Sequence, residues 1–160
     1  MPTHYEWLRT PWGRLLVCAD DRALRLVRFE DSRGSQRPER DWQRGGPVVE
    51  EAIRQLSAYL GGNLRRFTLP IAPEGSPFDR QVWRALRKIR FGRTDTYGQL
   101  AERIGKPGAA RAVGAAAGRN PIAIVIPCHR LLARGGRLGG FSAGLHRKRA
   151  LLDLEQDPLG

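Results

Sequence analysis

The sequence predicts an α/β chain of two domains, the first a sheet with one helix and the second mostly helical. Strand patterns separated by turn residues lie between Met1 and Glu30, whereas apolar residues at helical spacing dominate after Gly75. The charge changes at the same place, because the chain up to Gly75 holds 12 basic and 10 acidic side chains and the remainder holds 16 and 6. The turn residues Ala72 to Gly75 therefore mark the predicted boundary, with domains at 1–72 and 73–160.

Length and composition set the broad class. A chain of 160 residues, 41% of them hydrophobic, is long enough to bury a core. It has neither an apolar run of roughly 18 residues nor a secretory leader pattern, so we expect a cytoplasmic protein with no membrane partner. Two cysteines are too few for a disulfide framework or a four-ligand zinc site, and no metal or cofactor is expected. We expect Cys18, in a predicted strand, to be a buried hydrophobe, which leaves Cys128 as the reactive thiol.

The net charge of +12 is carried mainly by the C-terminal half. Solubility alone does not require that asymmetry, so the charge predicts a polyanionic partner, most simply nucleic acid. A solvated face in an arginine-rich composition is the alternative that the charge by itself leaves open.

The N-terminal elements follow from alternation and turn signals. Strands are predicted at 3–9, 14–19 and 22–29, separated by Thr10-Pro11-Trp12-Gly13 and Asp20-Asp21. A β-meander is the simplest assembly of three such strands.

A loop, a helix and a further strand complete this domain. Residues 31–46 are rich in Ser, Gly, Pro, Arg and Asp and predict a mobile loop. Pro47 suits the first turn of a helix, and the pair Gly61-Gly62 ends it. Residues 64–71 then predict one more short strand.

The C-terminal domain begins with two predicted helices. Ser76 can cap the first, whose apolar residues form one stripe through to Arg90. Thr94 or Thr96 caps the second, which ends at Gly105.

A third helix, residues 109–118, follows a tight turn that contains Pro107 and Gly108. Two short helices joined by such a turn form a helix-turn-helix pattern. The third helix consists mostly of small residues, which allow close approach to another surface, and Arg111 is its only long side chain. Arg111 could reach into a groove or fill the gap left by a displaced base, while alanines packed in the core with a solvated Arg111 stay open as an alternative.

The reactive centre is Pro127-Cys128-His129-Arg130, which follows the apolar run Ile122 to Ile126. The thiolate is the reactive form of cysteine, and an adjacent base or cation favours it. A Cys-His pair is weak evidence by itself, because neighbouring residues in an extended segment point in opposite directions.

Motifs around this centre follow one another through the C-terminal half. They are Phe78-x3-Val82-Trp83, Thr96-Tyr97-Gly98, Ala109-Ala110-Arg111-Ala112-Val113-Gly114, Asn120-Pro121, Pro127-Cys128-His129-Arg130 and Gly140-Phe141-Ser142-Ala143-Gly144. In this order they resemble the O6-alkylguanine-DNA alkyltransferases over the whole C-terminal half. Residues 1–70 resemble that family's N-terminal domain through Thr10-Pro11-Trp12-Gly13 and the strand order.

The resemblance implies a ribonuclease-H-like α/β domain followed by a mostly helical, winged helix-turn-helix DNA-binding domain that carries the active-site cysteine. It implies direct reversal repair, in which the alkyl group of O6-alkylguanine, or of O4-alkylthymine, is transferred once and irreversibly to Cys128. The partner is double-stranded DNA, bound through the minor groove with the damaged nucleotide flipped out. A nucleoid-associated monomer is expected, with cooperativity on DNA left open.

Catalytic roles are carried over by position. His129 matches the base that removes the thiol proton through a water, and Glu155 matches the carboxylate that orients His129. Asn120 matches the residue that braces the turn before the cysteine loop. This follows the general logic of nucleophile, base and orienter.

The resemblance also assigns substrate contacts. Tyr97 matches the phenol that donates to guanine N3, and Ser142 matches the residue that contacts O6, where negative charge develops. The backbone around Cys128 and Leu131 would accept hydrogen bonds from the exocyclic amine. Phe141 stands where the family commonly has tyrosine near the substrate loop.

DNA contacts are assigned to the third helix and the residue that follows it. These residues are Ala110, Arg111, Ala112, Gly114 and Arg119. Arg111 matches the arginine that intercalates in place of the extruded base. Arg119 and the cluster Arg147-Lys148-Arg149 could contact phosphates, whereas Arg130 is expected to have a structural role within its loop.

Some positions depart from the family pattern. Ala143 replaces a usual glycine, Ala123 stands where some members have a proline lining the pocket, and Arg90 stands where proline is typical. Together with Phe141, these differences affect the expected width of the pocket and its tolerance for bulky alkyl groups. They do not touch the nucleophile.

Other functions remain to be weighed. In a non-catalytic lesion-binding relative, another residue stands at the cysteine position, so Cys128 argues against that class. A helix-turn-helix regulator would not explain the Cys-His pair, and a cysteine hydrolase usually has its histidine far from the cysteine in sequence and would not need the basic half.

Overall fold

The computed structural model describes residues 1–156 and divides into two compact units, Met1–Glu74 and a second from Gly75 onward. Among the described residues, no helix is long and apolar enough to cross a membrane.

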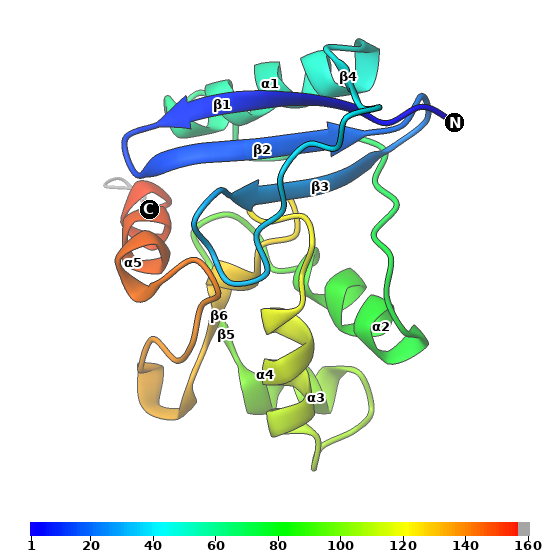
Figure 1. Ribbon diagram of the computed structural model, residues 1–160. Coiled ribbons are helices and arrows are strands. Elements are labelled where there is room, and N and C mark those ends of the chain that lie inside the picture. The colour runs from blue at the N-terminus through cyan, green and yellow to red at the C-terminus, as the bar shows by residue number, and fades with distance from the viewer. Residues whose placement is uncertain (157–160) are drawn as a thin grey trace. The chain divides into compact units, whose positions relative to one another are not determined.

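A four-stranded sheet in the order β3-β2-β1-β4 forms the first unit (Figure 1). The strands β1 (His4–Thr10), β2 (Gly13–Ala19) and β3 (Leu24–Phe29) are antiparallel neighbours, which confirms the predicted meander. The short strand β4 (Gln43–Arg44) pairs in parallel with β1. Part of the stretch 31–46 is therefore an edge strand rather than loop.

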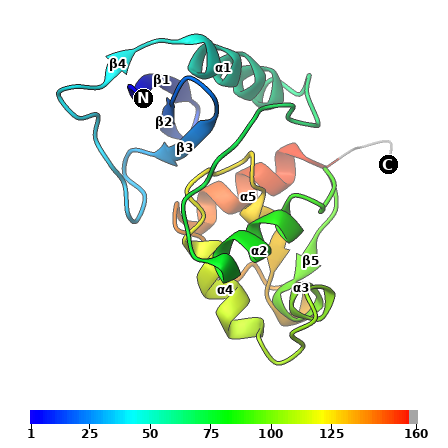
Figure 2. The same cartoon turned by 90° about the vertical axis from the view of Figure 1, so that its right-hand side faces the viewer.

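The helix α1 (Pro47–Leu60) packs along one face of this sheet (Figure 2). Its bounds are those the sequence predicts, with Pro47 in the first turn and Gly61 at the C-cap. Val49, Ala52 and Leu56 form its buried stripe. Together with the inward residues of β2 they make the core of the first unit.

The strand predicted at residues 64–71 is wrong. Within this fully described segment, only the last residue bridges to the sheet, at Leu24. The N–H of Thr68 donates to the side-chain oxygen of Gln55 at 2.9 Å instead of to a strand, and Pro70 has no N–H. The segment therefore lacks the donors that a continuous ladder needs.

The second unit begins with the helix α2 (Pro77–Leu86). The side chain of Ser76 caps it by accepting from the N–H of Asp79 at 3.0 Å, as the sequence predicts. The helix ends before the predicted Arg90, because the N–H groups of Lys88 and Ile89 bond to carbonyls three residues back, at 3.1 and 3.0 Å. Such bonds tighten and terminate an α-helix.

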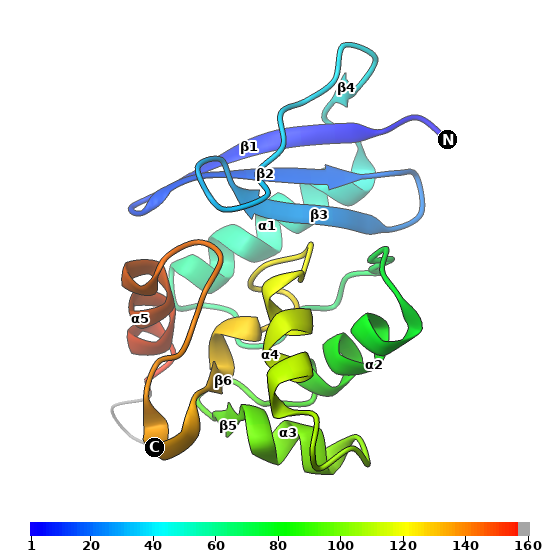
Figure 3. The same cartoon turned by 60° about the horizontal axis from the view of Figure 1, so that its bottom comes forward.

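The helices α3 (Tyr97–Arg103) and α4 (Ala110–Gly118) form the predicted helix-turn-helix pair and pack against each other (Figure 3). Thr96, not Thr94, caps α3 through a capping box with Gln99. Gly105, at φ +78°, follows the end of α3, where a left-handed backbone favours glycine.

Short elements connect this pair to the C-terminal helix. A 3-10 helix η1 (Cys128–Arg130) runs directly into β6 (Leu131–Leu132), which pairs in parallel with β5 (Asp95–Thr96) just before α3. A second 3-10 turn, η2 (Arg134–Gly136), leads toward α5 (Leu145–Leu154), and Figure 3 shows α5 and α4 on either side of β6. The pairing of β5 with β6 thus ties the cysteine segment to the start of α3.

Candidate active site

Cys128 lies at the first position of η1 and is only 7% exposed. The apolar run Ile122–Ile126 before it is buried except for the half-buried Ala123. It folds into a tight loop, in which the N–H of Val125 bonds to the carbonyl of Ala123 at 2.8 Å. At the centre of that loop Ile124 has φ +74°, which a β-branched residue adopts only under strain. The loop therefore holds the thiol at the edge of the core rather than on the surface.

Asn120 holds this loop together from within. Its buried amide nitrogen donates to the carbonyl of Ile126 at 2.8 Å and to the sulfur of Cys128 at 3.1 Å, while its oxygen accepts from the N–H of Ile122 at 2.9 Å. A donor to sulfur favours the thiolate over the thiol. Bracing of the turn follows the sequence prediction, but the direct bond to sulfur is an addition that only the fold reveals.

His129 and Glu155 form a buried pair. The imidazole Nε2 lies 2.7 Å from the carboxylate Oε2, with His129 fully buried and Glu155 2% exposed. A carboxylate only accepts, so Nε2 carries the hydrogen and Nδ1 keeps its lone pair in the neutral ring. Burial lowers the pKa of His129 against the opposing effect of Glu155, and Nδ1 has no hydrogen-bond partner among the described residues. The ring is therefore a neutral base with a free acceptor nitrogen.

Arg130 completes the arrangement behind the histidine. Its Nε and Nη2 donate to the two carboxylate oxygens of Glu155 at 2.7 and 2.9 Å, and its Nη1 donates to the carbonyl of Ile89 at 2.7 Å. Burial alone would raise the pKa of Glu155, but the hydrogen bonds from His129 and Arg130 outweigh it and lower the pKa to about 2. Glu155 is thus a permanent anion shared by two neighbours of Cys128.

Tyr97, the first residue of α3, connects the helix pair to the glycine loop, residues 139–144. Its hydroxyl oxygen accepts from the N–H of Gly140 at 3.2 Å, which leaves the phenol proton free to be donated. Added side chains would meet its ring: a Cβ at Gly114 of α4 would lie 3.6 Å from it, and one at Gly139 would collide with the hydroxyl. Gly139 therefore lets the loop close on the phenol, whereas a Cβ at Gly114 would only make an ordinary van der Waals contact with the ring.

Lys148 of α5 corrects a sequence-based prediction. It is fully buried, and its Nζ donates to the carbonyls of Leu131 at 2.6 Å and Gly140 at 3.2 Å. Burial lowers its pKa to about 8. Arg147 is buried as well, so the predicted phosphate contacts are wrong for these two residues, and only Arg149 of the cluster is exposed. A basic triplet on a helix carries no sequence signal that two members turn inward.

The remaining substrate-contact candidates lie around the same loop. Leu131 is buried in β6, while Phe141 and Ser142 are partly exposed directly after Gly140. Gly140 is held at its N–H by Tyr97 and at its carbonyl by Lys148. Phe141 and Ser142 therefore follow directly after a residue whose N–H and carbonyl are both held by side-chain hydrogen bonds.

The residues of α4 that are predicted to contact DNA differ in their exposure to solvent. Arg111 and Ala112 are exposed, Ala110 and Gly114 are half-buried, and Val113 faces the core. Arg111 stands at the second position of the helix, so it projects from a surface of small residues. This is the smooth face with one long cation that the sequence suggests.

Arg119, after the end of α4, lies in an ion pair. Its Nη2 is 2.6 Å from Oδ1 of Asp79, and this hydrogen bond lowers the pKa of the carboxyl. The side chain of Arg119 remains 55% exposed, while that of Asp79 is 9% exposed. The pair joins the end of α4 to the start of α2.

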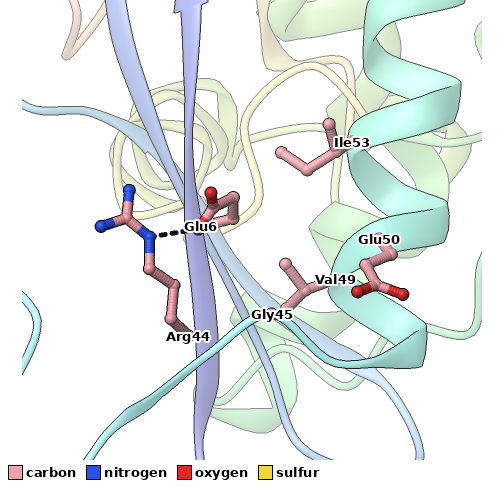
Figure 4. A pocket seen from close by; sticks show the side chains of 6 residues that line it. All are labelled: Glu6, Arg44, Gly45, Val49, Glu50 and Ile53. Carbon is pink, nitrogen blue, oxygen red and sulfur yellow. Dashed lines mark hydrogen bonds and ion pairs between the residues drawn. The ribbon is translucent and has the colours of Figure 1, made fainter.

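A pocket of about 280 Å³ lies in the first unit (Figure 4). It is lined by Glu6, Arg44, Gly45, Val49, Glu50 and Ile53. Two of these residues, Glu6 and Arg44, form an ion pair of 2.8 Å. The pocket lining contains neither a cysteine nor a histidine.

Comparison with known proteins identifies the two units. Residues 77–157 match the family described as 6-O-methylguanine DNA methyltransferase, DNA binding domain, and residues 3–73 match its ribonuclease-like domain. This chain belongs to the 6-O-methylguanine DNA methyltransferase family. The methyltransferase binds DNA and repairs it by direct reversal, as a methylated-DNA–protein-cysteine methyltransferase. The predicted function and the predicted two-domain fold are confirmed.

Individual relatives support the same family. The methyltransferase is 42% identical to a methylated-DNA–protein-cysteine methyltransferase of Methanosarcina acetivorans, over 95% of this chain and 97% of the relative. It is 41% identical to that of Haemophilus influenzae, over 97% and 87%. Its fold is similar to Mycobacterium tuberculosis OGT in complex with DNA, with a TM-score of 0.87 and 40% identity over 96% of this chain and 92% of that one.

Proposed function

We propose that Cys128 is the methyl acceptor and that His129, Glu155 and Asn120 activate it. The observation that carries the proposal is the hydrogen-bonded relay of His129 with Glu155 at 2.7 Å, beside a sulfur that accepts from Asn120 at 3.1 Å. Nucleophile, base and orienter are then contiguous in one buried centre. Every one of these groups comes from the same chain, which favours action as a monomer.

The reaction is an in-line displacement at the alkyl carbon. The proton of the Cys128 thiol passes through a water to Nδ1 of His129, and the sulfur forms a bond to the alkyl carbon as the carbon–O6 bond breaks. The electron pair of that bond stays on guanine, which takes up a proton, so that the thiol proton in effect replaces the alkyl group. The product is a thioether at Cys128, and the protein acts once.

Negative charge develops on the guanine during the displacement, and hydrogen-bond donors are needed to stabilise it. Tyr97 keeps its phenol proton free, because its oxygen accepts from Gly140, and it can donate to N3 of the purine. We assign the contact to O6 to Ser142, with Phe141 and the backbone of Leu131 forming the remaining wall. Lys148 supports this wall by fixing Gly140 and Leu131.

The DNA substrate must bring the base to the thiol. Cys128 is 7% exposed, so a base stacked inside a duplex is out of its reach and has to be flipped out. We assign the minor-groove contact to α4, with Ala110, Ala112 and Gly114 allowing close approach and Arg111 occupying the vacated position. Arg119 can reach a phosphate only in competition with Asp79. Because the proposed substrate is DNA, we assign the protein to the nucleoid as part of this proposal.

Mass spectrometry tests the acceptor directly. We expect the intact protein, incubated with duplex DNA that contains O6-methylguanine, to gain one methyl group on the peptide bearing Cys128. Undamaged duplex of the same sequence is the control and should leave the peptide unchanged. An unmodified Cys128 peptide after prolonged incubation with the lesion would overturn the assignment.

Replacing Arg111 with alanine separates flipping from simple charge attraction. We expect the rate of methyl transfer to fall more for a fully paired lesion than for a mismatched one, because a mismatched base costs less to extrude. Single-turnover rates on the two duplexes measure the difference. Equal losses on both would show that Arg111 contributes only an electrostatic contact.

A further inference from the structure

The last turn of α4 is weakly held by its own sequence. It contains Gly118, and glycine favours a helix less than alanine does. The N–H groups of Arg119 and Asn120 bond to carbonyls three or four residues back at 3.1 to 3.2 Å, which is the long end of the range for such bonds. The position of this turn therefore depends on contacts with other elements.

Two side-chain contacts with α2 supply that hold. The helices α2 and α4 pack against each other (Figure 3), and the indole N–H of Trp83 donates to the carbonyl of Ala116 at 2.9 Å. Beyond it, Nε and Nη2 of Arg119 both donate to the carboxylate of Asp79, at 3.2 and 2.6 Å. A guanidinium that binds through two nitrogens is fixed in direction as well as in distance.

The positions of the two charges favour this ion pair. Asp79 lies in the first turn of α2, where the helix end carries partial positive charge, and Arg119 directly follows α4, where the helix end carries partial negative charge. The side chain of Asp79 is only 9% exposed, which restricts the carboxylate, although that of Arg119 is 55% exposed. The pair thus ties two helix ends of opposite partial charge.

We propose that the ion pair of Asp79 with Arg119 positions the next residue for the reaction, by holding the amide of Asn120 against the Cys128 sulfur. The proposal rests on the proposed role of Cys128 as methyl acceptor. A guanidinium fixed on α2 fixes the point at which the chain leaves α4. From there the amide of Asn120 donates to the sulfur at 3.1 Å and to the carbonyl of Ile126 at 2.8 Å. Without the ion pair this turn moves, the bond to sulfur weakens, and less of the thiol is ionised.

Ionisation of Cys128 reports on this contact without DNA. The thiolate absorbs in the ultraviolet where the thiol does not, so a pH titration of each full-length protein, corrected with its Cys128→Ser counterpart, gives the midpoint of ionisation. We expect Asp79→Asn and Arg119→Gln each to raise that midpoint by about one pH unit, the net contribution of roughly one hydrogen bond. The double variant should raise it no further, because both changes break the same pair.

The direction of the change in Asp79→Asn separates positioning from a direct effect of charge. Removing a carboxylate favours a nearby anion, so the field of Asp79 acting directly on the thiol would give a lower midpoint in the variant. Lost positioning gives a higher one. The variants leave unaltered the charged and titratable groups of η1 and α5 around the thiol, which are His129, Arg130, Lys148 and Glu155.

An ion pair of the first unit provides the matched control. Asp20 has a side chain 10% exposed and lies 2.8 Å from Arg25, whose side chain is 39% exposed. Asp20→Asn should leave the midpoint of Cys128 unchanged. An unchanged or lowered midpoint in Asp79→Asn, a further rise in the double variant, or an equal rise in Asp20→Asn would overturn the proposal. Methyl transfer by the unaltered protein is measured separately by mass, and its absence would instead refute the proposed acceptor.

Discussion

Replacing Cys128 with serine is expected to abolish methyl transfer, while the protein should still bind DNA that contains O6-methylguanine. The serine hydroxyl is a far weaker nucleophile than a thiolate and, unlike a thiol, is not ionised to a useful extent near neutral pH. The amide of Asn120 can still donate to the serine oxygen, so the loop should keep its fold. Mass spectrometry of the lesion reaction and a gel-shift titration measure the two properties.

Cys18 provides the matched control. It is buried in β2, and burial raises the pKa of its thiol to about 12, so it stays protonated and inert near neutral pH. Cys18→Ser should therefore transfer methyl groups to Cys128 at the unaltered rate. Transfer that survives in Cys128→Ser, or disappears in Cys18→Ser, would mean that the nucleophile is misassigned.

Replacing Glu155 with glutamine is expected to impair both stability and reaction. The variant leaves the buried guanidinium of Arg130 without its anion, and breaking a buried ion pair in this way costs about 3–5 kcal/mol in the free energy of unfolding. It also removes the charge that favours proton uptake by His129, so we expect transfer to slow by about 10²–10⁴-fold, the usual contribution of a general base. Urea unfolding and single-turnover transfer measure the two effects.

Acidification gives this variant an independent signature. The pKa of Glu155 is about 2 in the folded protein against an ordinary 4.5, so the stability it contributes is present above pH 4.5 and is lost as the pH falls toward 2. That part of the acid lability should be missing from Glu155→Gln. Asp153→Asn, an exposed acid on the same helix, is the control and should match the unaltered protein. Equal stability and rate in both variants would remove Glu155 from the relay.

Local sequence was sufficient for most elements of the fold. The cap at Ser76, the meander of β1 to β3 and the bounds of α1 follow from residues that are neighbours in the chain. The strand expected at 64–71 failed for one local reason, because Pro70 has no N–H, and for one non-local reason, because Thr68 donates to Gln55 of a helix. The helix α2 ends earlier than the sequence predicts, because the apolar pattern determines the existence of a helix better than the position of its last turn.

By itself the sequence determined the two-domain α/β class, the basic C-terminal half, and the Cys-His pair within an order of motifs that resembles one repair family. Only the tertiary structure decided that Glu155 serves both His129 and Arg130, and that Lys148 turns inward to hold the glycine loop. The physical reason is range. Caps, turns and periodicity act within a few residues, whereas these buried charges meet partners up to 26 positions away, and only packing brings such groups within hydrogen-bond distance.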